Sequence, residues 1–137
     1  RGLLDETQAL IEKRMRQIVE NIGAAHGAEV TLDYTHEFVV LNNSDEQTEI
    51  AAAAARAVVG SELVDDDCLP CHCSEDFAQM LREKPGCYLL IGNGTEGAAG
   101  QPLHNPHYDF NDELISIGAS YWTKLAETEL CKSGPAA

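Results

Sequence analysis

The apolar positions near the start of the chain repeat with the period of an α-helix. Between residues 5 and 22, apolar side chains recur at steps of three and four residues and form a single stripe. The members of this stripe are Leu10, Ile11, Met15, Ile18, Val19 and Ile22. Gly23 or Gly27 is expected to end the helix, because glycine readily adopts the left-handed conformation that follows many helices.

The pattern then changes to a period of two, which is typical of a strand. Over residues 29–40, mostly apolar even positions alternate with polar odd positions. The alternation predicts a half-buried strand. Because it is longer than the usual five or so residues, we expect it to bend or to pass between two parts of the fold. A continuous apolar run at residues 87–91 predicts a second strand that is buried on both faces.

A second helix is predicted over about residues 45–59. Ser44 precedes it as an N-cap, and Gln47 follows three residues later, which is the capping-box pattern. In that pattern the Ser44 side chain accepts the backbone N–H of Gln47, and the Gln47 side chain accepts the backbone N–H of Ser44. Gly60 stops the helix.

Two more helices are predicted in the second half of the chain. Ser74 is expected to cap a short helix that Pro85-Gly86 terminates. Asn111 is expected to cap a last helix, whose apolar stripe starts at Leu114. Residues 132–137 are expected to form a frayed tail. Helices combined with two strands predict the α/β fold class.

Composition narrows the classes of partner. The 137 residues hold 23 acidic and 9 basic side chains, so the net charge is −14. That charge argues against nucleic acid or an anionic membrane as a partner, because both are polyanions. No apolar run is long enough to span a bilayer.

Five cysteines, an odd number, and no visible signal peptide predict a cytoplasmic location. Because residue 1 is not Met, we expect translation to begin upstream of it.

The segment from Cys68 to Cys73 has three candidate chemistries. Its sequence, CLPCHC, fits a c-type haem attachment, a redox pair or half of a zinc site. Haem attachment would need an export signal, and none is visible. A redox pair would need its thiols at the start of a helix that follows a strand, which this segment does not provide. A zinc site would need a second pair of ligands, and none follows. An irregular loop that holds thiols is therefore favoured, and a small Cys/His metal or redox module is the weaker alternative.

His104 is a stronger candidate for chemistry. It lies in a loop between the predicted buried strand and the last helix, where functional residues of α/β folds gather. Taken alone, a histidine beside Asn-Pro is more often a turn residue than a ligand, and Pro106 breaks any helical spacing to His107. The chain has no GxSxG, HExxH or Walker motif, so the residues alone leave the function open.

Several motifs in order resemble one enzyme family. They are CSEDFA from Cys73, PGCY from Pro85, IGNG from Ile91, LHNPHYDFND from Leu103, and Gly118 with Tyr121-Trp122. The opening resembles the same family through Arg1, Glu6-Thr7 and IEKRMRQIVENI from Ile11. These motifs are similar to those of the dinuclear metal-dependent amidohydrolases, which include hippuricase, N-acyl-L-amino-acid amidohydrolase and the indole-acetyl-amino-acid hydrolases.

The resemblance implies an organisation in two parts. Residues 1–37 would be the end of a lid, or dimerisation, α+β domain. Residues 38–137 would be the closing segment of a metallopeptidase-like α/β catalytic domain. Family members are much longer than this chain. The resemblance also implies a homo-oligomer formed through the lid domain.

The resemblance further implies a site and a reaction. His104 would be a metal ligand, and the complete site would hold two divalent ions, zinc or manganese, which this chain alone would not fully bind. The positions on the substrate side or supporting the ligand are Cys73, Ser74, Glu75, Asn105, Asp109 and Asn111. Cys73 stands where the family has glycine, so we expect an altered substrate contact.

The implied reaction is hydrolysis of the amide bond of an N-acyl amino acid by a metal-activated water. This chain holds only one of the expected ligands, so by itself it is predicted to be inactive. The alternative from another class is a fragment without catalysis that dimerises or interacts through lid-type surfaces.

Overall fold

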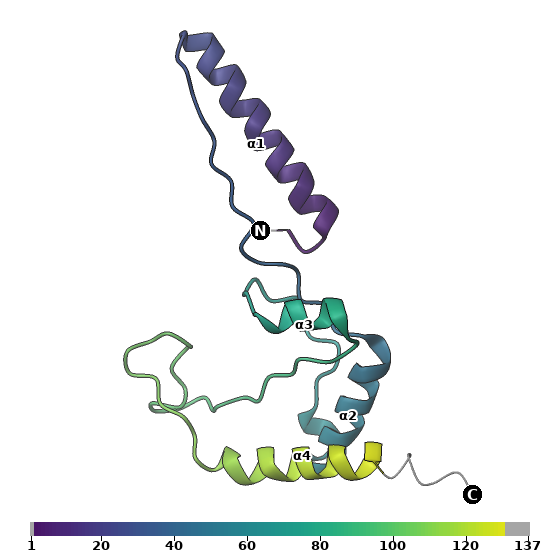
Figure 1. Ribbon diagram of the computed structural model, residues 1–137. Helices are drawn as coiled ribbons and strands as arrows, with labels where there is room; N and C mark the ends of the chain where they lie inside the picture. The colour runs from purple at the N-terminus through teal and green to yellow at the C-terminus, as the bar shows by residue number, and fades with distance from the viewer. Residues whose placement is uncertain (1, 131–137) are drawn as a thin grey trace, which may run out of the picture. The chain divides into compact units, whose positions relative to one another are not determined.

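The computed structural model describes residues 2–130. Arg1 and the predicted tail at residues 132–137 lie outside the described part. Figure 1 shows its helices, which are α1 (Asp5–His26), α2 (Asp45–Val59), the 3₁₀ turn η1 (Ser61–Leu63), α3 (Phe77–Glu83) and α4 (Leu114–Leu130). The chain divides into two compact units. The first consists of the residues up to Asn42 with Leu69–Pro85, and the second of Asn43–Cys68 with the residues from Gly86 onward.

In the first unit, α1 has the predicted type and start but continues four residues further. It ends at Gly27, which is left-handed with φ 63° and donates its N–H to the Ala24 carbonyl. The chain then runs back along the helix (Figure 1). Gly23 is buried, and a Cβ on it would stand 2.5 Å from Cγ2 of Val30. Glycine therefore lets the returning chain lie against α1 at this point.

The returning segment is extended but is not a strand. Side chains of α1 hold it instead: Arg16 Nη1 donates to the Leu32 carbonyl at 3.4 Å, and His36 Nε2 lies 2.7 Å from Glu12 Oε2. The prediction of a strand over residues 29–40 is therefore wrong: no strand forms there in the described part of the chain. A strand requires a ladder of backbone hydrogen bonds to a second strand, and the described residues supply none.

Helix α3 belongs to the first unit and starts later than predicted. Its N-cap is Asp76 rather than Ser74. It ends at Lys84, which is extended, because the residue before a proline is disfavoured in a helix. The Arg82 guanidinium binds both carboxylate oxygens of Asp5 at 2.9 and 3.1 Å, which joins α3 to the start of α1.

In the second unit, α2 packs against α4, as Figure 1 shows. The buried residues of these two helices are small on α2 and large on α4: Ala51, Ala52 and Ala54 are buried on α2, and Tyr121 on α4 is only 5% exposed. Burial raises the pKa of the Tyr121 hydroxyl, and the nearby Cys87 thiol adds to the rise. Alanine side chains leave room for the tyrosine, so these residues form the core of the unit.

The bounds of α2 are confirmed, but its predicted capping box is not. No side chain caps its first turn. Instead, Ser44 Oγ accepts the N–H of Gly86 at 3.2 Å, and Ser44 N–H donates to the Gly86 carbonyl at 3.0 Å. Asn43 also makes two bonds to one residue: its Oδ1 accepts the N–H of Tyr88 at 2.8 Å, and its Nδ2 donates to the Tyr88 carbonyl at 2.9 Å.

The second predicted strand, at residues 87–91, is also absent. Residues 87–91 are extended, yet their backbone is held at Tyr88 by the Asn43 side chain and not by a neighbouring strand. Within residues 2–130 the regular elements are all helical, so the α/β fold class is not confirmed by this part of the chain. None of the helices described there is long and apolar enough to cross a bilayer.

Candidate functional site

The loop that carries His104 is closed by one asparagine. Asn93 Nδ2 donates to the carbonyls of Ala99, at 2.9 Å, and of Asp109, at 2.8 Å. Its Oδ1 accepts the N–H of Asn111 at 2.9 Å, and its own carbonyl accepts Nδ2 of Asn111 at 3.2 Å. Both ends of the loop from residue 98 to 111 therefore meet at Asn93. We call this meeting point the neck of the loop.

Backbone contacts complete the neck. The N–H of Asp109 donates to the Ala98 carbonyl at 3.3 Å, and that of Gly100 donates to the Glu96 carbonyl at 2.9 Å. A Cβ on Gly100 would stand 2.4 Å from the carbonyl carbon of Thr95. Glycine is therefore required at residue 100 for the chain to turn this closely on itself.

His104 lies at the tip of this loop, five residues after Ala99 and five before Asp109. It is exposed, and it has a φ of 69°, the one positive φ outside glycine in residues 2–130. The N–H of Asn105 donates to the Pro102 carbonyl at 3.1 Å. His104 thus occupies the third position of a hydrogen-bonded turn, which in a type II turn takes a positive φ and is usually glycine or asparagine.

The other predicted residues of this loop act on the backbone. Asn105 Oδ1 accepts the N–H of His107 at 2.9 Å. Asp109 Oδ1 accepts the N–H of the next residue at 2.9 Å. Asn111 Oδ1 accepts the N–H of Glu113 at 3.1 Å, just before α4 begins. The structure therefore brings His104, Asn105, Asp109 and Asn111 into one loop, where the last three shape the chain.

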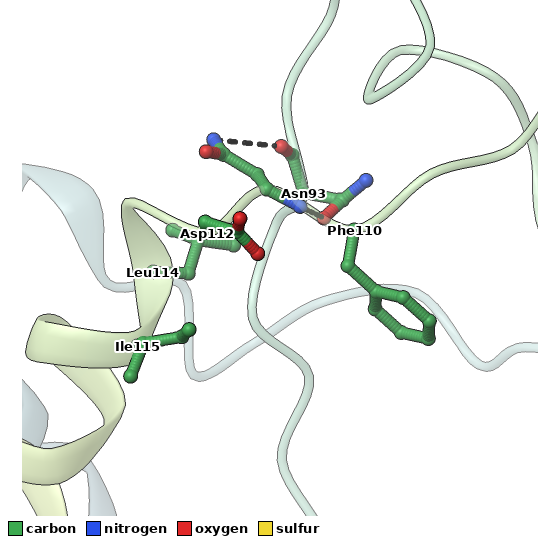
Figure 2. Close-up of a pocket in the computed structure, with 6 residues that line it drawn as sticks. Asn93, Phe110, Asp112, Leu114 and Ile115 are labelled. Atoms are coloured by element: carbon green, nitrogen blue, oxygen red, sulfur yellow. Dashed lines mark hydrogen bonds between the residues drawn. The ribbon is translucent and has the colours of Figure 1, made fainter.

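A cavity of about 460 Å³ lies next to the neck. Figure 2 shows Asn93 and Phe110 on one side of it and Asp112, Leu114 and Ile115 on the other. The dashed line in that view is the bond between Asn111 Nδ2 and the Asn93 carbonyl. Phe110 and Ile115 remain 78% and 70% exposed, so this apolar surface is largely uncovered within the described residues.

The residues predicted on the substrate side lie in the first unit, just before α3. Ser74 and Glu75 are half-buried, and Cys73 is exposed. The neighbouring Cys71 side chain is the main cause that raises the pKa of the Cys73 thiol, and burial adds to it. A raised thiol pKa disfavours the thiolate, which is the form that acts as a nucleophile or metal ligand.

The donor set of the described residues fits one metal ligand, not a complete centre. In residues 2–130, no three histidine, cysteine or acidic side chains come together in a way that would hold a metal ion. Cys68, Cys71 and Cys73 are exposed and form no disulfide. The imidazole of His104 is chemically suited to zinc and other borderline divalent ions, so it fits as one ligand of a larger set.

Asn93 is a functional residue that the sequence analysis does not predict, because it stands there only as part of the IGNG motif. Its position between Gly92 and Gly94 was a usable signal, because a lone amide in a glycine-rich turn has both donors and an acceptor for loop backbone.

Comparison with known proteins decides the family. The sequence profile of peptidase family M20/M25/M40 matches residues 4–128. The chain belongs to peptidase family M20/M25/M40. This match confirms the family that the motifs from Cys73 to Trp122 predicted. No solved structure matches the chain significantly.

The curated relatives are named as a hydrolase and as deacetylases. The chain is 31% identical to hippurate hydrolase of Campylobacter jejuni over 126 residues, which cover 92% of the chain and 32% of that enzyme. It is 31% identical to N-acetyldiaminopimelate deacetylase of Streptococcus thermophilus and 28% identical to N-acetylcysteine deacetylase of Bacillus subtilis. These two matches cover 88% of the chain and 30% of each relative. The chain thus spans about a third of the length of these relatives.

Proposed function

We propose that this chain supplies His104 as a metal ligand to an M20/M25/M40 enzyme that hydrolyses the amide bond of N-acyl amino acids. The observation that carries the proposal is the placement of His104. Its imidazole is exposed at the tip of a loop that Asn93 closes, and its backbone has a φ of 69°. Family membership and the names of the relatives supply the reaction class.

The backbone of His104 supports a functional role independently of the family. A positive φ is uncommon outside glycine, and holding such a residue costs about 1–3 kcal/mol unless its side chain bonds locally. Because the His104 side chain is exposed at this turn, its imidazole is accessible to a metal ion.

The other ligands would come from the remainder of the enzyme. A bound zinc or manganese ion would acidify a water molecule and polarise the amide carbonyl of the substrate. This chain's own contribution is one imidazole nitrogen, held at the loop tip. Asn105, Asp109 and Asn111 would keep that tip in shape through the backbone bonds they accept.

Residues 73–75 are proposed to lie on the substrate side of the complete site. By its resemblance to the family motif, Cys73 stands where a glycine is expected, and its exposed side chain would add bulk at a position where the backbone is otherwise bare. We infer that this position changes the substrates that the enzyme accepts. Ser74 and Glu75 are half-buried, which suits a role in fixing the start of α3 beside that contact.

The division into residues 1–37, a lid domain, and residues 38–137, part of a catalytic domain, remains part of the proposal, and the extended segments fit parts of a larger fold. Residues 29–40 and 87–91 have strand patterns but lack strand partners in the described residues. We propose that strands from the rest of a full-length enzyme pair with them. The relatives, about three times as long as this chain, have the residues to do so.

Helix α1 is proposed to serve the assembly of the enzyme. Its apolar stripe is largely uncovered, with Leu10, Ile18 and Ile22 between 54% and 57% exposed. A second copy of the lid domain would bury this stripe and make a homo-oligomer. The same surface is what the alternative function, an interaction fragment without catalysis, would use.

A cytoplasmic location remains part of the proposal. Cys68, Cys71, Cys73 and Cys87 are all free thiols within residues 2–130. Free thiols, three of them exposed, fit a reducing compartment better than an oxidising one.

The test compares two histidines of the same loop in the full-length polypeptide. Hippurate and N-acetylated amino acids are the substrates, and product is measured before and after removal of metal with a chelator. His104→Asn keeps the tolerance for a positive φ but removes the imidazole. We expect it to lower kcat/KM by more than about 100-fold, because loss of groups that only support a ligand already costs 10–100-fold.

His107→Asn is the matched control, since His107 is exposed three residues away and only its backbone N–H is bonded in the loop. It should leave hydrolysis close to that of the unaltered enzyme. Equal activity of the two variants would refute the ligand role of His104. No chelator-sensitive hydrolysis in the unaltered polypeptide would favour the interaction fragment instead.

A further inference from the structure

Asn93 has a wider role than a residue of a glycine-rich turn. Its side chain makes three hydrogen bonds, and its carbonyl accepts a fourth, all to the two ends of the loop that carries His104. We propose that Asn93 is a positioning residue for His104, which places the imidazole by holding both ends of the loop at the neck. This inference rests on the proposed function, in which His104 is a metal ligand.

The tip of the loop is shaped internally but is not placed by its own contacts. Its described hydrogen bonds run within the tip, from Asn105 to Pro102, and from His107 and Tyr108 to Asn105. His104 is exposed, and its neighbour Leu103 is 68% exposed. The position of the tip relative to the rest of the second unit therefore depends on the neck.

Apolar packing does not hold the neck. The cavity beside Asn93 is lined by Phe110, Leu114 and Ile115, and the exposed fractions of Phe110 and Ile115 show that little covers them. Hydrogen bonds are the described contacts that join the loop ends, and those of the Asn93 side chain join Ala99 to both Asp109 and Asn111. Figure 2 shows Asn93 at this junction, with Phe110 on one side and Leu114, the first residue of α4, on the other.

The amide group is specifically suited to this junction. Two carbonyls face Nδ2, and one backbone N–H faces Oδ1, so two donors and one acceptor are needed within one planar group. Aspartate has the same shape but would direct an oxygen at both carbonyls. Serine would supply one hydroxyl and restore at most part of the set. The three residue types therefore give distinct predictions.

Asn43 provides a matched control in the same unit. Its amide also binds backbone on both sides, donating to the Tyr88 carbonyl at 2.9 Å and accepting the Tyr88 N–H at 2.8 Å. Neither Asn43 nor Tyr88 belongs to the His104 loop. Loss of the Asn43 amide should lower stability without moving His104, whereas loss of the Asn93 amide should do both.

The experiment measures zinc affinity, kcat and KM of the full-length polypeptide carrying Asn93→Ala, Asn93→Asp, Asn43→Ala or His104→Asn. Zinc affinity is obtained by competition with a chromophoric chelator, and thermal unfolding is recorded for each variant. We expect Asn93→Ala to bind zinc about 10–100-fold more weakly and to lower kcat more than it raises KM. Asn93→Asp should show the same losses of zinc affinity and kcat, because its side chain has no N–H to donate to the two carbonyls. Asn43→Ala should keep both values while unfolding at a lower temperature.

Two results would overturn the inference in distinguishable ways. If Asn93→Ala binds zinc as tightly as Asn43→Ala while His104→Asn loses it, Asn93 is structural only and the proposed function survives. If His104→Asn also keeps its zinc affinity, the proposed function and this inference both fail. Should Asn93→Ala not fold, Asn93→Ser is measured instead. The zinc affinity of Asn93→Ser should lie between that predicted for Asn93→Ala and that of the unaltered enzyme. Full zinc affinity in a folded Asn93→Ser variant would contradict the positioning role of Asn93.

Discussion

At the scale of single residues, side chains that bind backbone organise the second unit. Asn93, Asn105, Asn111 and Ser44 each accept a backbone N–H at 2.9 to 3.2 Å. Asn93, Asn105 and Asn111 fix the His104 loop and the approach to α4, whereas Ser44 joins the residue before α2 to Gly86. The first three residues therefore connect the local sequence to the placement of the His104 loop.

Ser44 offers the clearest stability test of this kind. Its hydroxyl accepts the N–H of Gly86 across 42 positions of sequence, and it is part-buried. Ser44→Ala should therefore lower the free energy of unfolding by about 1 kcal/mol, as measured by urea denaturation. Ser120→Ala is the control, because its exposed hydroxyl bonds only to the Ser116 carbonyl of its own helix. An equal effect of the two substitutions would contradict the role of Ser44.

The same residues show where sequence reasoning succeeds. Ser44 was predicted as the residue before α2, and it is, because the start of a helix follows from nearby residues. The partner of its hydroxyl was not predicted, because Gly86 is distant in sequence. Asn93 was missed for the same reason, since its bonds reach residues 6 to 18 positions away. His104 is a candidate from its position in a loop, but its role as a metal ligand comes only from the resemblance to a family.

At the scale of elements, helices followed from the sequence and strands did not. The hydrogen bonds of α1, α2 and α4 lie within each helix, so the periodic pattern and the flanking residues predict them. A strand takes its hydrogen bonds from another segment. The alternation at residues 29–40 correctly indicates an extended chain with two different faces, but it cannot state whether a partner strand is present.

The contact of this extended segment with α1 predicts a dependence on pH. Glu12 accepts two bonds from Arg16, at 2.6 and 2.9 Å, and lies 2.7 Å from His36. The Arg16 hydrogen bond, followed by that of His36, lowers the pKa of the Glu12 carboxyl below its usual 4.5. A lowered pKa in the folded state means that the stabilisation is complete above the unfolded value and is lost as pH falls through the folded value.

Glu12→Gln should therefore destabilise the protein at pH 6, and the difference from the unaltered protein should shrink as pH falls below 4.5. Thermal unfolding at a series of pH values measures this difference. Glu20→Gln, an exposed position on the same helix, is the control. A Glu12→Gln effect that is constant from pH 6 to the acid range would contradict the proposed contact.

At the scale of the whole molecule, too little apolar surface is covered for the described residues to stand alone. The buried apolar residues are Ala51, Ala52, Ala54, Ala78 and Tyr121, and no large side chain in residues 2–130 is fully buried. Trp122 is 63% exposed, like the stripe of α1. Apolar surface of this extent is normally covered by other protein. This agrees with a chain that spans about a third of its relatives.

The uncovered stripe of α1 leads to a prediction about assembly. If a second copy covers it, Ile18→Glu should convert an oligomer of the full-length polypeptide into monomers, because a carboxylate would be buried in an apolar interface. Light scattering coupled to size exclusion reads the mass directly. Lys13→Glu, a charge change on the same helix outside the stripe, should leave the mass unchanged. An unchanged mass for Ile18→Glu would place the interface elsewhere.

The central claim is that His104 binds metal in an M20/M25/M40 amidohydrolase. Its most direct test is the zinc content of the full-length polypeptide, measured by elemental analysis after dialysis against zinc-free buffer. We predict two zinc ions in the unaltered protein and in His107→Asn, and the loss of at least one in His104→Asn. Retention of both ions by His104→Asn would contradict the account.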